Sequence, residues 1–261
     1  MRLLYPDNPF NQREPDEVFA QEYDAARARG FDVSLFSFED FERGHFNPKP
    51  KFAKDEAIIY RGWMLGLDGY ARLTQAVAAL SARMVVSPDS YRAAHHLPSW
   101  YPLIQPFTAE TLILEENADF VAALRDKNWD GYFVKDYVKS LNTGAGSLAK
   151  TPAEIEHIVA QIKKYRGEVE GGVCVRRGEA YKPDSERRYF VAHARAFSAD
   201  GDIPAAVAAC APLIPSPFFS VDVALRADGI LRIIEIGDGQ VSDRKEWSAE
   251  KLVAVLEQIA V

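Results

Sequence analysis

Two acidic residues interrupt apolar segments near the end of the chain. Asp222 lies within FFSVDVAL and Glu235 within ILRIIEIGDGQ, and both segments read as buried strands. A buried carboxylate is costly unless a cation compensates it. The intervening RADG, with Asp228 and Gly229, predicts a hairpin turn. We therefore expect Asp222 and Glu235 to face each other near the open end of a hairpin.

Such a pair of acids is typical of a magnesium site. Hard oxygen ligands favour Mg²⁺, with Mn²⁺ as an alternative, and these ions usually bind substrate phosphates as well. Asp238, on the turn after the second strand, would complete the set of ligands. The alternative is that the acids form ion pairs with Arg188 or Arg232 and bind no metal.

The segment GYFVKDYVKSLNTGAGSLAK is the second candidate for chemistry. Lys135 lies in a predicted strand, where a buried lysine needs an anionic partner. Lys139 and Ser140 begin a loop with Gly144 and Gly146, whose backbone N–H groups can approach phosphates. The spacing does not match a Walker-type loop. The alternative is an exposed linker carrying two surface lysines.

Two arginines at strand ends complete the candidates. In ERRYFVAHARAF, strand alternation turns one of Arg187 and Arg188 inward, and an inward arginine near a phosphate would stabilise charge during phosphoryl transfer. Arg61 ends the predicted strand AIIYRGWML, at the position where open α/β sheets bind ligands, so it would hold an anionic substrate. A surface ion pair for Arg188 and simple packing for Arg61 are the alternatives.

The elements that must position these residues differ between the two ends of the chain. The first ninety residues alternate strands and helices, which predicts a small open α/β unit with a parallel sheet and right-handed crossovers. The predicted elements are strands at 1–6, 31–38, 57–65 and 84–87 and helices at 17–30 and 68–84.

The rest of the chain is richer in strands and predicts an antiparallel α+β arrangement. Its predicted strands are 131–138, 171–177, 187–198, 218–225 and 229–238, and its predicted helices are 116–128, 151–167 and 249–261. We expect two domains, an N-terminal α/β substrate-side domain at 1–105 and a nucleotide-binding and catalytic domain at 106–261.

Composition narrows the class of protein. The chain has 261 residues, is 48% hydrophobic and carries a net charge of −7, which argues against a general nucleic-acid binder. Its two cysteines do not make a disulfide framework. We expect no signal peptide and no membrane span, and hence a cytoplasmic protein. No feature predicts the oligomeric state.

Taken in order, these segments resemble the ATP-grasp superfamily of ATP-dependent carboxylate ligases, in particular its divergent members from bacteria and phages. The resemblance covers nearly the whole chain, and FFSVDVAL…GILRIIEIGDGQ and YFVKDYVKS carry it most specifically. It implies a small open α/β unit that precedes an ATP-grasp fold with antiparallel sheets. It also implies ATP and Mg²⁺ as cofactors.

The resemblance gives most candidates a role. Lys135 would contact the α-phosphate, and Lys139 with the loop 140–147, Ser140 included, would cover the β- and γ-phosphates. The backbone around Val175 and Arg176 would meet adenine.

Glu179 would bind the ribose hydroxyls and Arg188 would face the transferring phosphoryl group. Asp222 and Glu235 would hold Mg²⁺.

Two positions depart from the family pattern. The family usually continues Glu-x-Asn, and here Gly237 stands in place of Asn, so Asp238 would substitute from the next position. The family's other lysine has no clear match, because Lys127 is a poor candidate, and Arg61 or His96 would stand in.

The implied function is a Mg²⁺- and ATP-dependent ligase. A substrate carboxylate would attack the γ-phosphate to give an acylphosphate, and an amine or similar nucleophile would displace phosphate, with the glycine-bearing loop closed against water. The partners would be ATP, a carboxylate and a nucleophile. The alternatives are an ATP-dependent small-molecule kinase and a non-catalytic nucleotide-binding or inhibitor protein.

Overall fold

A computed structural model describes residues 1–141 and 146–259 of the chain. These residues form two compact units. Unit 1 comprises residues 1–94, 188–221 and 237–261, and unit 2 comprises residues 95–187 and 222–236. The units divide the chain differently from the predicted domains, 1–105 and 106–261, which stay a prediction.

Unit 1 begins with the predicted open α/β sheet. Its strands are β1 (Arg2–Asn8), β2 (Asn11–Pro15), β3 (Asp32–Phe36), β4 (Ala57–Tyr60) and β5 (Arg83–Met84). β1 pairs in parallel with β3 and β4, and β4 pairs in parallel with β5, so the prediction of a parallel sheet is confirmed. The accompanying helices are α1 (Ala20–Ala28), α2 (Phe38–Glu42), α3 (Leu67–Ala79) and α4 (Pro88–His95).

The core of this sheet is apolar on both faces. Leu3, Leu4, Ile58 and Ile59 have no exposed surface. Consecutive strand residues point to opposite faces, so their joint burial means that both faces of the sheet are covered.

Two turns were not apparent from the sequence. The breaker-rich segment after β1 forms the antiparallel strand β2, with the Asn8 side chain accepting a hydrogen bond from the Phe10 amide. The predicted strand 187–198 is in fact a hairpin, β10 (Arg187–Ala192) and β11 (Arg195–Phe197), because His193 and Ala194 have φ of 45° and 63°. Neither residue is a usual signal for such a turn.

The remaining strands join the hairpin in a sheet of order β11-β10-β12-β13. These strands are β12 (Phe218–Leu225) and β13 (Leu231–Asp238), and helices α8 (Ala205–Cys210) and α9 (Ala249–Glu257) complete the set. The division between the units falls within β12 and β13. In unit 1, α9 contacts α1, and the Arg29 guanidinium lies 2.8 Å from the Glu257 carboxylate.

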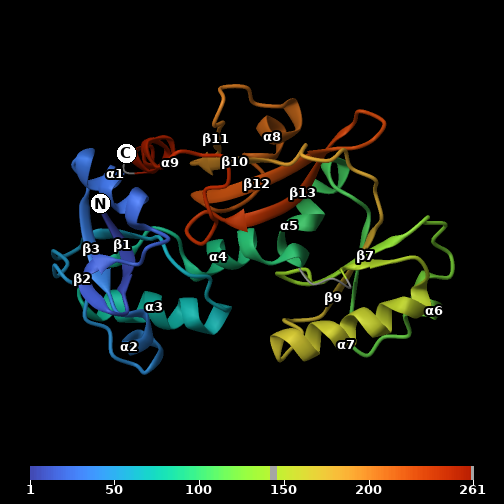
Figure 1. Cartoon of the computed structure of the whole chain (residues 1–261), viewed down its shortest axis with the longest axis horizontal. Helices are drawn as coiled ribbons and strands as arrows, with labels where there is room; N and C mark the ends of the chain where they lie inside the picture. Colours follow the sequence, from blue (N-terminus) through green and yellow to red (C-terminus); the bar gives the residue numbers. More distant parts are fainter. Residues whose placement is uncertain (142–145, 260–261) are drawn as a thin grey trace. The chain divides into compact units, whose positions relative to one another are not determined.

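Unit 2 is built on an antiparallel sheet of order β6-β9-β7-β8. Its elements are α5 (Leu97–Ile104), the 3₁₀ turn η1 (Gln105–Phe107), β6 (Thr111–Leu114), α6 (Phe120–Leu124), β7 (Tyr132–Asp136), β8 (Leu148–Ala149), the 3₁₀ turn η2 (Pro152–Glu154), α7 (Ile155–Arg166) and β9 (Val173–Arg177). Figure 1 shows α7, in yellow, running along β7 and β9.

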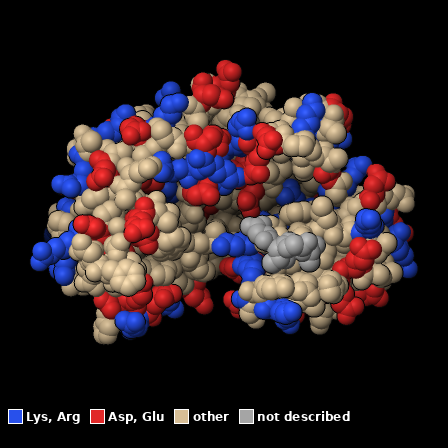
Figure 2. All heavy atoms as spheres, viewed as in Figure 1, with Lys and Arg blue, Asp and Glu red and all other residues tan. Residues whose placement is uncertain are grey.

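The architecture is thus mixed α/β with antiparallel sheets, as predicted. No helix among residues 1–141 and 146–259 has the length and apolar character to cross a membrane. Figure 2 shows basic and acidic side chains intermixed over the face that it displays.

Candidate functional site

One face of the β6-β9-β7-β8 sheet forms the core of unit 2. Val134, Val173 and Val175 pack there with Ile155 and Ile162 of α7, and all five are fully buried. The spacing IxxIVxxI gives the helix one apolar face, and alternate residues of the strands give the sheet one apolar face. These two faces pack together, so the other face of the sheet is not part of this core.

The opposite face carries the polar candidates. Lys135 is the cross-strand partner of Cys174, and Phe133 is the partner of both Arg176 and Leu148. Directly paired residues share a face of a sheet, so these five side chains lie on one surface. Lys135 and Arg176 are 4% and 5% exposed, and burial raises the pKa of the Cys174 thiol to about 12.

A cavity of about 570 Å³ lies in unit 2 over this surface. This volume is within the range of small-molecule sites. Its lining includes five predicted site residues, Lys135, Ser140, Arg176, Glu179 and Glu235. The sequence therefore predicted residues that the fold brings together.

The central contact is an ion pair between β7 and β13. The Lys135 Nζ donates a hydrogen bond to the Glu235 carboxylate at 2.9 Å. The lysine side chain is 5% exposed and the carboxylate 43% exposed, so the acid faces the cavity while the base lies in its floor. A carboxylate held in this way is open to a cation, and the ammonium group is open to an anion.

Arg176 lies close to this pair. Its guanidinium donates hydrogen bonds to the Ile234 carbonyl and the Thr108 hydroxyl, both at 2.6 Å. Its Cζ lies 5.9 Å from the centre of the Trp100 ring. Because Ile234 directly precedes Glu235, Arg176 fixes the backbone that carries the acid.

Glu179 is engaged within unit 2 by three side chains. Its carboxylate oxygens lie 3.3 Å from Arg226 and from Arg232, and it accepts a hydrogen bond of 2.7 Å from the Tyr181 hydroxyl. Burial and this contact raise the pKa of Tyr181. The predicted contact of Glu179 with ribose stays a prediction, since its present partners tie the β12–β13 hairpin to the segment after β9.

A buried acid holds the first residues after β7. Asp136 is fully buried, accepts hydrogen bonds from the amides of Val138 and Lys139, and pairs with the Arg166 guanidinium. Ser140 lines the cavity, and Lys139 is exposed. The predicted phosphate loop at 140–147 includes residues 142–145, which lie outside the described residues.

The three predicted metal ligands lie in different surroundings, and their binding of a metal stays a prediction. Among residues 1–141 and 146–259, no three His, Cys, Asp or Glu side chains come together as a metal site. Asp222 belongs to unit 2 and is 1% exposed. Asp238 belongs to unit 1, where its Oδ1 accepts hydrogen bonds from the Gln240 amide and side chain. Burial raises the pKa of Asp238 to about 7.

The two arginines predicted to be catalytic belong to unit 1 and have acidic partners there. Arg188 is the inward member of its pair, since it is 8% exposed while Arg187 is exposed, and its guanidinium pairs with Asp243. Arg61 is 1% exposed, and its Nε lies 2.7 Å from the Glu22 carboxylate. These contacts explain both arginines structurally, and their catalytic roles stay predictions.

His96, the suggested replacement for a lysine, contacts an acid instead. Its Nε2 lies 3.4 Å from the Glu170 carboxylate in unit 2. Burial lowers the pKa of the adjacent His95 to about 4. His95 is therefore neutral at physiological pH.

Several lining residues were missed from the sequence, namely Ala109, Phe133, Leu148, Arg177, Tyr181, Glu186 and Ile234. The sequence could have predicted Phe133, because in GYFVKDYV it stands two positions before Lys135 and so lies on the same face of the strand. The others come from separate segments, and only the pairing of β7 with β8 and β9 brings them to the cavity.

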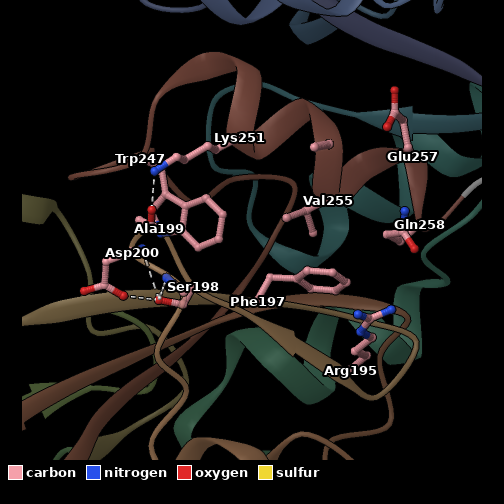
Figure 3. A pocket seen from close by; sticks show the side chains of 12 residues that line it. Arg195, Phe197, Ser198, Ala199, Asp200, Trp247, Lys251, Val255, Glu257 and Gln258 are labelled. Atoms are coloured by element: carbon pink, nitrogen blue, oxygen red, sulfur yellow. Dashed lines mark hydrogen bonds between the residues drawn. The ribbon is translucent and has the colours of Figure 1, made fainter.

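A second cavity, of about 630 Å³, lies in unit 1 beside α9 (Figure 3). Some of its polar groups serve local structure, because Lys251 donates to the Ala199 carbonyl and Ser198 donates to the Asp200 carboxylate. Glu257 pairs with Arg29. The candidate site is therefore the cavity of unit 2.

Comparison with known proteins identifies a family that matches the chain. A family model described as "ATP-grasp domain, R2K clade family 3" matches residues 114–256, and no curated protein matches the chain.

Solved structures show a similar fold over nearly the whole chain. D-cycloserine synthetase DcsG is 16% identical with a TM-score of 0.64, covering 99% of this chain and 100% of its own. The D-alanine-D-alanine ligase from Coxiella burnetii is 12% identical with a TM-score of 0.65, covering 99% and 94%. The ATP-grasp ligase PsnB, complexed with a phosphomimetic variant of its minimal precursor, Mg and ADP, is 13% identical with a TM-score of 0.59, covering 99% and 96%.

Proposed function

Because the chain belongs to family 3 of the R2K clade of ATP-grasp domains, we propose that it is an ATP-dependent ligase whose unit 2 cavity binds Mg²⁺ and ATP. The proposed reaction activates a carboxylate as an acylphosphate for attack by an amine or similar nucleophile. The observation that carries the proposal is the Lys135–Glu235 ion pair, 2.9 Å long, within a cavity of nucleotide size in the matched region.

The two members of the pair suit the two charged parts of a metal–nucleotide complex. Lys135 lies in the floor and would donate to a phosphate oxygen. Glu235 offers hard carboxylate oxygens in the cavity, and Mg²⁺ on a nucleotide commonly takes only one or two carboxylates beside phosphate oxygens. Glu235 therefore fits the ion. Asp222 is 1% exposed and is not one of the described residues that line the cavity, so its role as the second ligand rests on the family resemblance. When bound, the ion would neutralise the terminal phosphates and polarise the transferred phosphoryl group.

The rest of the lining suits the remainder of the nucleotide. Phe133 and Leu148 form an apolar part of the same surface, which would pack against a purine ring. Ser140 would donate to a phosphate oxygen.

In the proposed reaction, a carboxylate oxygen of the substrate bonds to the γ-phosphorus of ATP. The bond between the γ-phosphorus and the bridging oxygen breaks at the same time, and ADP leaves. The nucleophile then attacks the acyl carbon, phosphate leaves, and the amine gives up a proton. The contribution of this chain would be to hold the phosphates through Lys135 and to hold the cation through Glu235. The carboxylate and the nucleophile are the parts of the proposal that rest on the family resemblance.

Thermal unfolding tests the site directly. A ligand of the native state raises the midpoint, so ADP and ATP should each raise it, and Mg²⁺ should enlarge the shift. Glu235→Gln should retain the nucleotide shift but lose its enlargement by Mg²⁺. Glu116→Gln is the matched control, because Glu116 also pairs with a lysine in unit 2 and is similarly exposed, at 38%.

The result decides between clear outcomes. An equal Mg²⁺ effect in wild type and Glu235→Gln would remove Glu235 from the metal site. The absence of any shift with millimolar nucleotide would contradict the proposed function. With binding established, ATP turnover with candidate carboxylates and amines follows, and a phosphorylated product instead of a ligated one would assign the site to a kinase.

A further inference from the structure

Arg176 is unusual among the buried arginines of this chain. Arg2, Arg61 and Arg188 are each at most 9% exposed, and each pairs with an acid, Glu56, Glu22 and Asp243 respectively. Arg176 is 5% exposed, and no carboxylate lies within ion-pair distance of it among residues 1–141 and 146–259.

The acids nearest to Arg176 in the cavity already have basic partners. Glu235 pairs with Lys135, and Glu179 pairs with Arg226 and Arg232. The partners of Arg176 are instead neutral, a carbonyl, a hydroxyl and the Trp100 ring. Glu235 and Glu179 therefore act on the Arg176 charge only from beyond ion-pair distance, and they do not offset the effect of its burial.

The hydrogen-bonding capacity of Arg176 is also incompletely used. A guanidinium has five N–H groups. Two of them donate to Ile234 and Thr108, and Nε is buried without a hydrogen-bond partner in the described part of the chain. Donors therefore remain on a side chain that lines the cavity.

An arginine in this situation cannot lower its cost by losing a proton. Burial lowers the pKa of Arg176, but a guanidinium keeps its charge at any physiological pH. A buried charge without a counter-charge costs several kcal/mol, as a general rule. A bound anion would remove that cost, and the cavity is where an anion can reach the side chain.

We propose that the Arg176 side chain is an anion-binding residue of the cavity and contacts a phosphate of the bound nucleotide together with Lys135. The inference rests on the proposed function and adds a contact to it, since the sequence assigned only the backbone of Arg176 to the nucleotide.

Strand geometry supports contacts of Lys135 and Arg176 with the same phosphate chain. Lys135 is the partner of Cys174, and Arg176 lies two residues further along β9 on the same face, a separation of about 7 Å. Arg176 is the nearer of the two cations to the segment that follows β9, where Glu179 and Tyr181 line the cavity. It therefore suits the phosphate next to the nucleoside, and Lys135 suits the phosphates beyond.

The test compares ADP, AMP and adenosine by isothermal titration calorimetry on the full chain. Arg176→Met keeps the length of the side chain and removes its charge. We expect ADP and AMP to bind about tenfold more weakly, the loss of one charge-assisted contact, and adenosine to change less than about twofold.

Arg125→Met is the control. Arg125 also belongs to unit 2, is exposed and is not one of the described residues that line the cavity, so it carries the same charge in a screened position. We expect its ADP affinity to stay within about twofold of wild type. An equal loss of ADP affinity in both variants would indicate a non-specific effect of positive charge and would overturn the specific contact.

Two further variants separate binding from positioning. Thr108→Val removes one anchor of the guanidinium and keeps its charge, so it should retain most of the ADP affinity. Arg176→Lys keeps the charge without the planar fork, and should lose less ADP affinity than Arg176→Met. If Arg176→Met does not fold, Arg176→Lys carries the test, and an equal loss of adenosine and ADP affinity in it would overturn the proposal.

The remaining outcomes are equally decisive. Unchanged ADP affinity in a folded Arg176→Met variant would overturn the inference and leave the nucleotide site standing. An equal loss for adenosine would show that Arg176 serves the base or the fold. A wild-type protein that binds none of the three ligands would overturn the proposed function, and the inference with it.

Discussion

Arg61 in unit 1 and Arg176 in unit 2 are both buried, and their surroundings differ in kind. Arg61 donates two hydrogen bonds to the Glu22 carboxylate, from Nε at 2.7 Å and from Nη2 at 2.8 Å, and others to the carbonyls of Gly239 and Ser242. Arg176 has neutral partners and an N–H group without an acceptor among the described residues. One environment is complete within the protein, and the other is complete only with a ligand.

The difference also appears in the pKa values. Burial alone would lower the pKa of Arg61, but Glu22, with smaller contributions from Tyr5 and Asp238, reverses the effect and the pKa is raised. Burial lowers the pKa of Arg176, and the acids near it do not reverse the effect. A buried group with a lowered or raised pKa in a cavity is a candidate for function, whereas a matched ion pair is typical of structure.

Breaking the matched pair should have the largest effect on stability. Arg61→Met leaves Glu22 buried without its counter-charge, and we expect a loss of about 3–5 kcal/mol in the free energy of unfolding. Denaturant unfolding measures it. The double variant Arg61→Met with Glu22→Leu should recover much of the loss, because no isolated charge remains. A loss below about 1 kcal/mol in the single variant would contradict the structural role of Arg61.

Glu235→Gln should have the largest effect on activity and little effect on stability. The side chain is 43% exposed, so its ion pair contributes little to folding. We expect turnover to fall by roughly a hundredfold or more, because an electrostatic contact of the reacting centre is lost. Steady-state kinetics with varied Mg²⁺ provide the measurement. An unfolding free energy that falls with unchanged turnover would make Glu235 a structural acid.

Lys135→Met should weaken ADP binding by about tenfold through the loss of one charged phosphate contact. Its partner, Glu235, stays partly solvated and is not stranded. Titration calorimetry measures the affinity, with Lys163→Met as a control, since Lys163 pairs with Glu116 at the surface of unit 2. Equal ADP affinity for wild type and Lys135→Met would remove Lys135 from the site.

Asp238 gives a smaller, pH-dependent effect within unit 1. Burial raises its pKa from 3.8 to about 7, so between these values the folded state binds more protons than the unfolded state. Its contribution to stability is therefore lost as pH rises from about 4 through 7, by at most about 1.4 kcal/mol per pH unit.

The variant Asp238→Asn isolates this contribution. Relative to wild type, it should become more stable as pH rises across that window, measured by denaturant unfolding at several pH values. A constant difference between the two proteins would show that Asp238 does not titrate there. The comparison with Arg176 is direct, because a buried acid can discharge itself by taking a proton and a buried arginine cannot.

Much of the fold followed from local patterns in the sequence. The β-α-β order of the first ninety residues predicted the parallel sheet of unit 1, and Asp228-Gly229 predicted the turn between β12 and β13, where Gly229 has φ of 90°. These features depend on neighbouring residues and on allowed backbone angles, so a single sequence carries them. The hairpin at His193 and Ala194 was not predicted, because an alanine rarely takes positive φ and the pair is not one of the usual hairpin-turn sequences.

The sequence by itself determined which chemical groups the site has. Lys135, Glu235, Arg176, Glu179 and Ser140 were singled out by their types, by an apolar setting or by the family pattern, and all five line one cavity. Tertiary structure decided which charges match. Glu22 with Arg61 and Glu179 with Arg226 join residues far apart in the chain, and Arg176 is left without an acid only because its neighbours in space have other partners. Ion pairing depends on distances of a few ångströms across the fold, and strand register, not sequence spacing, sets those distances.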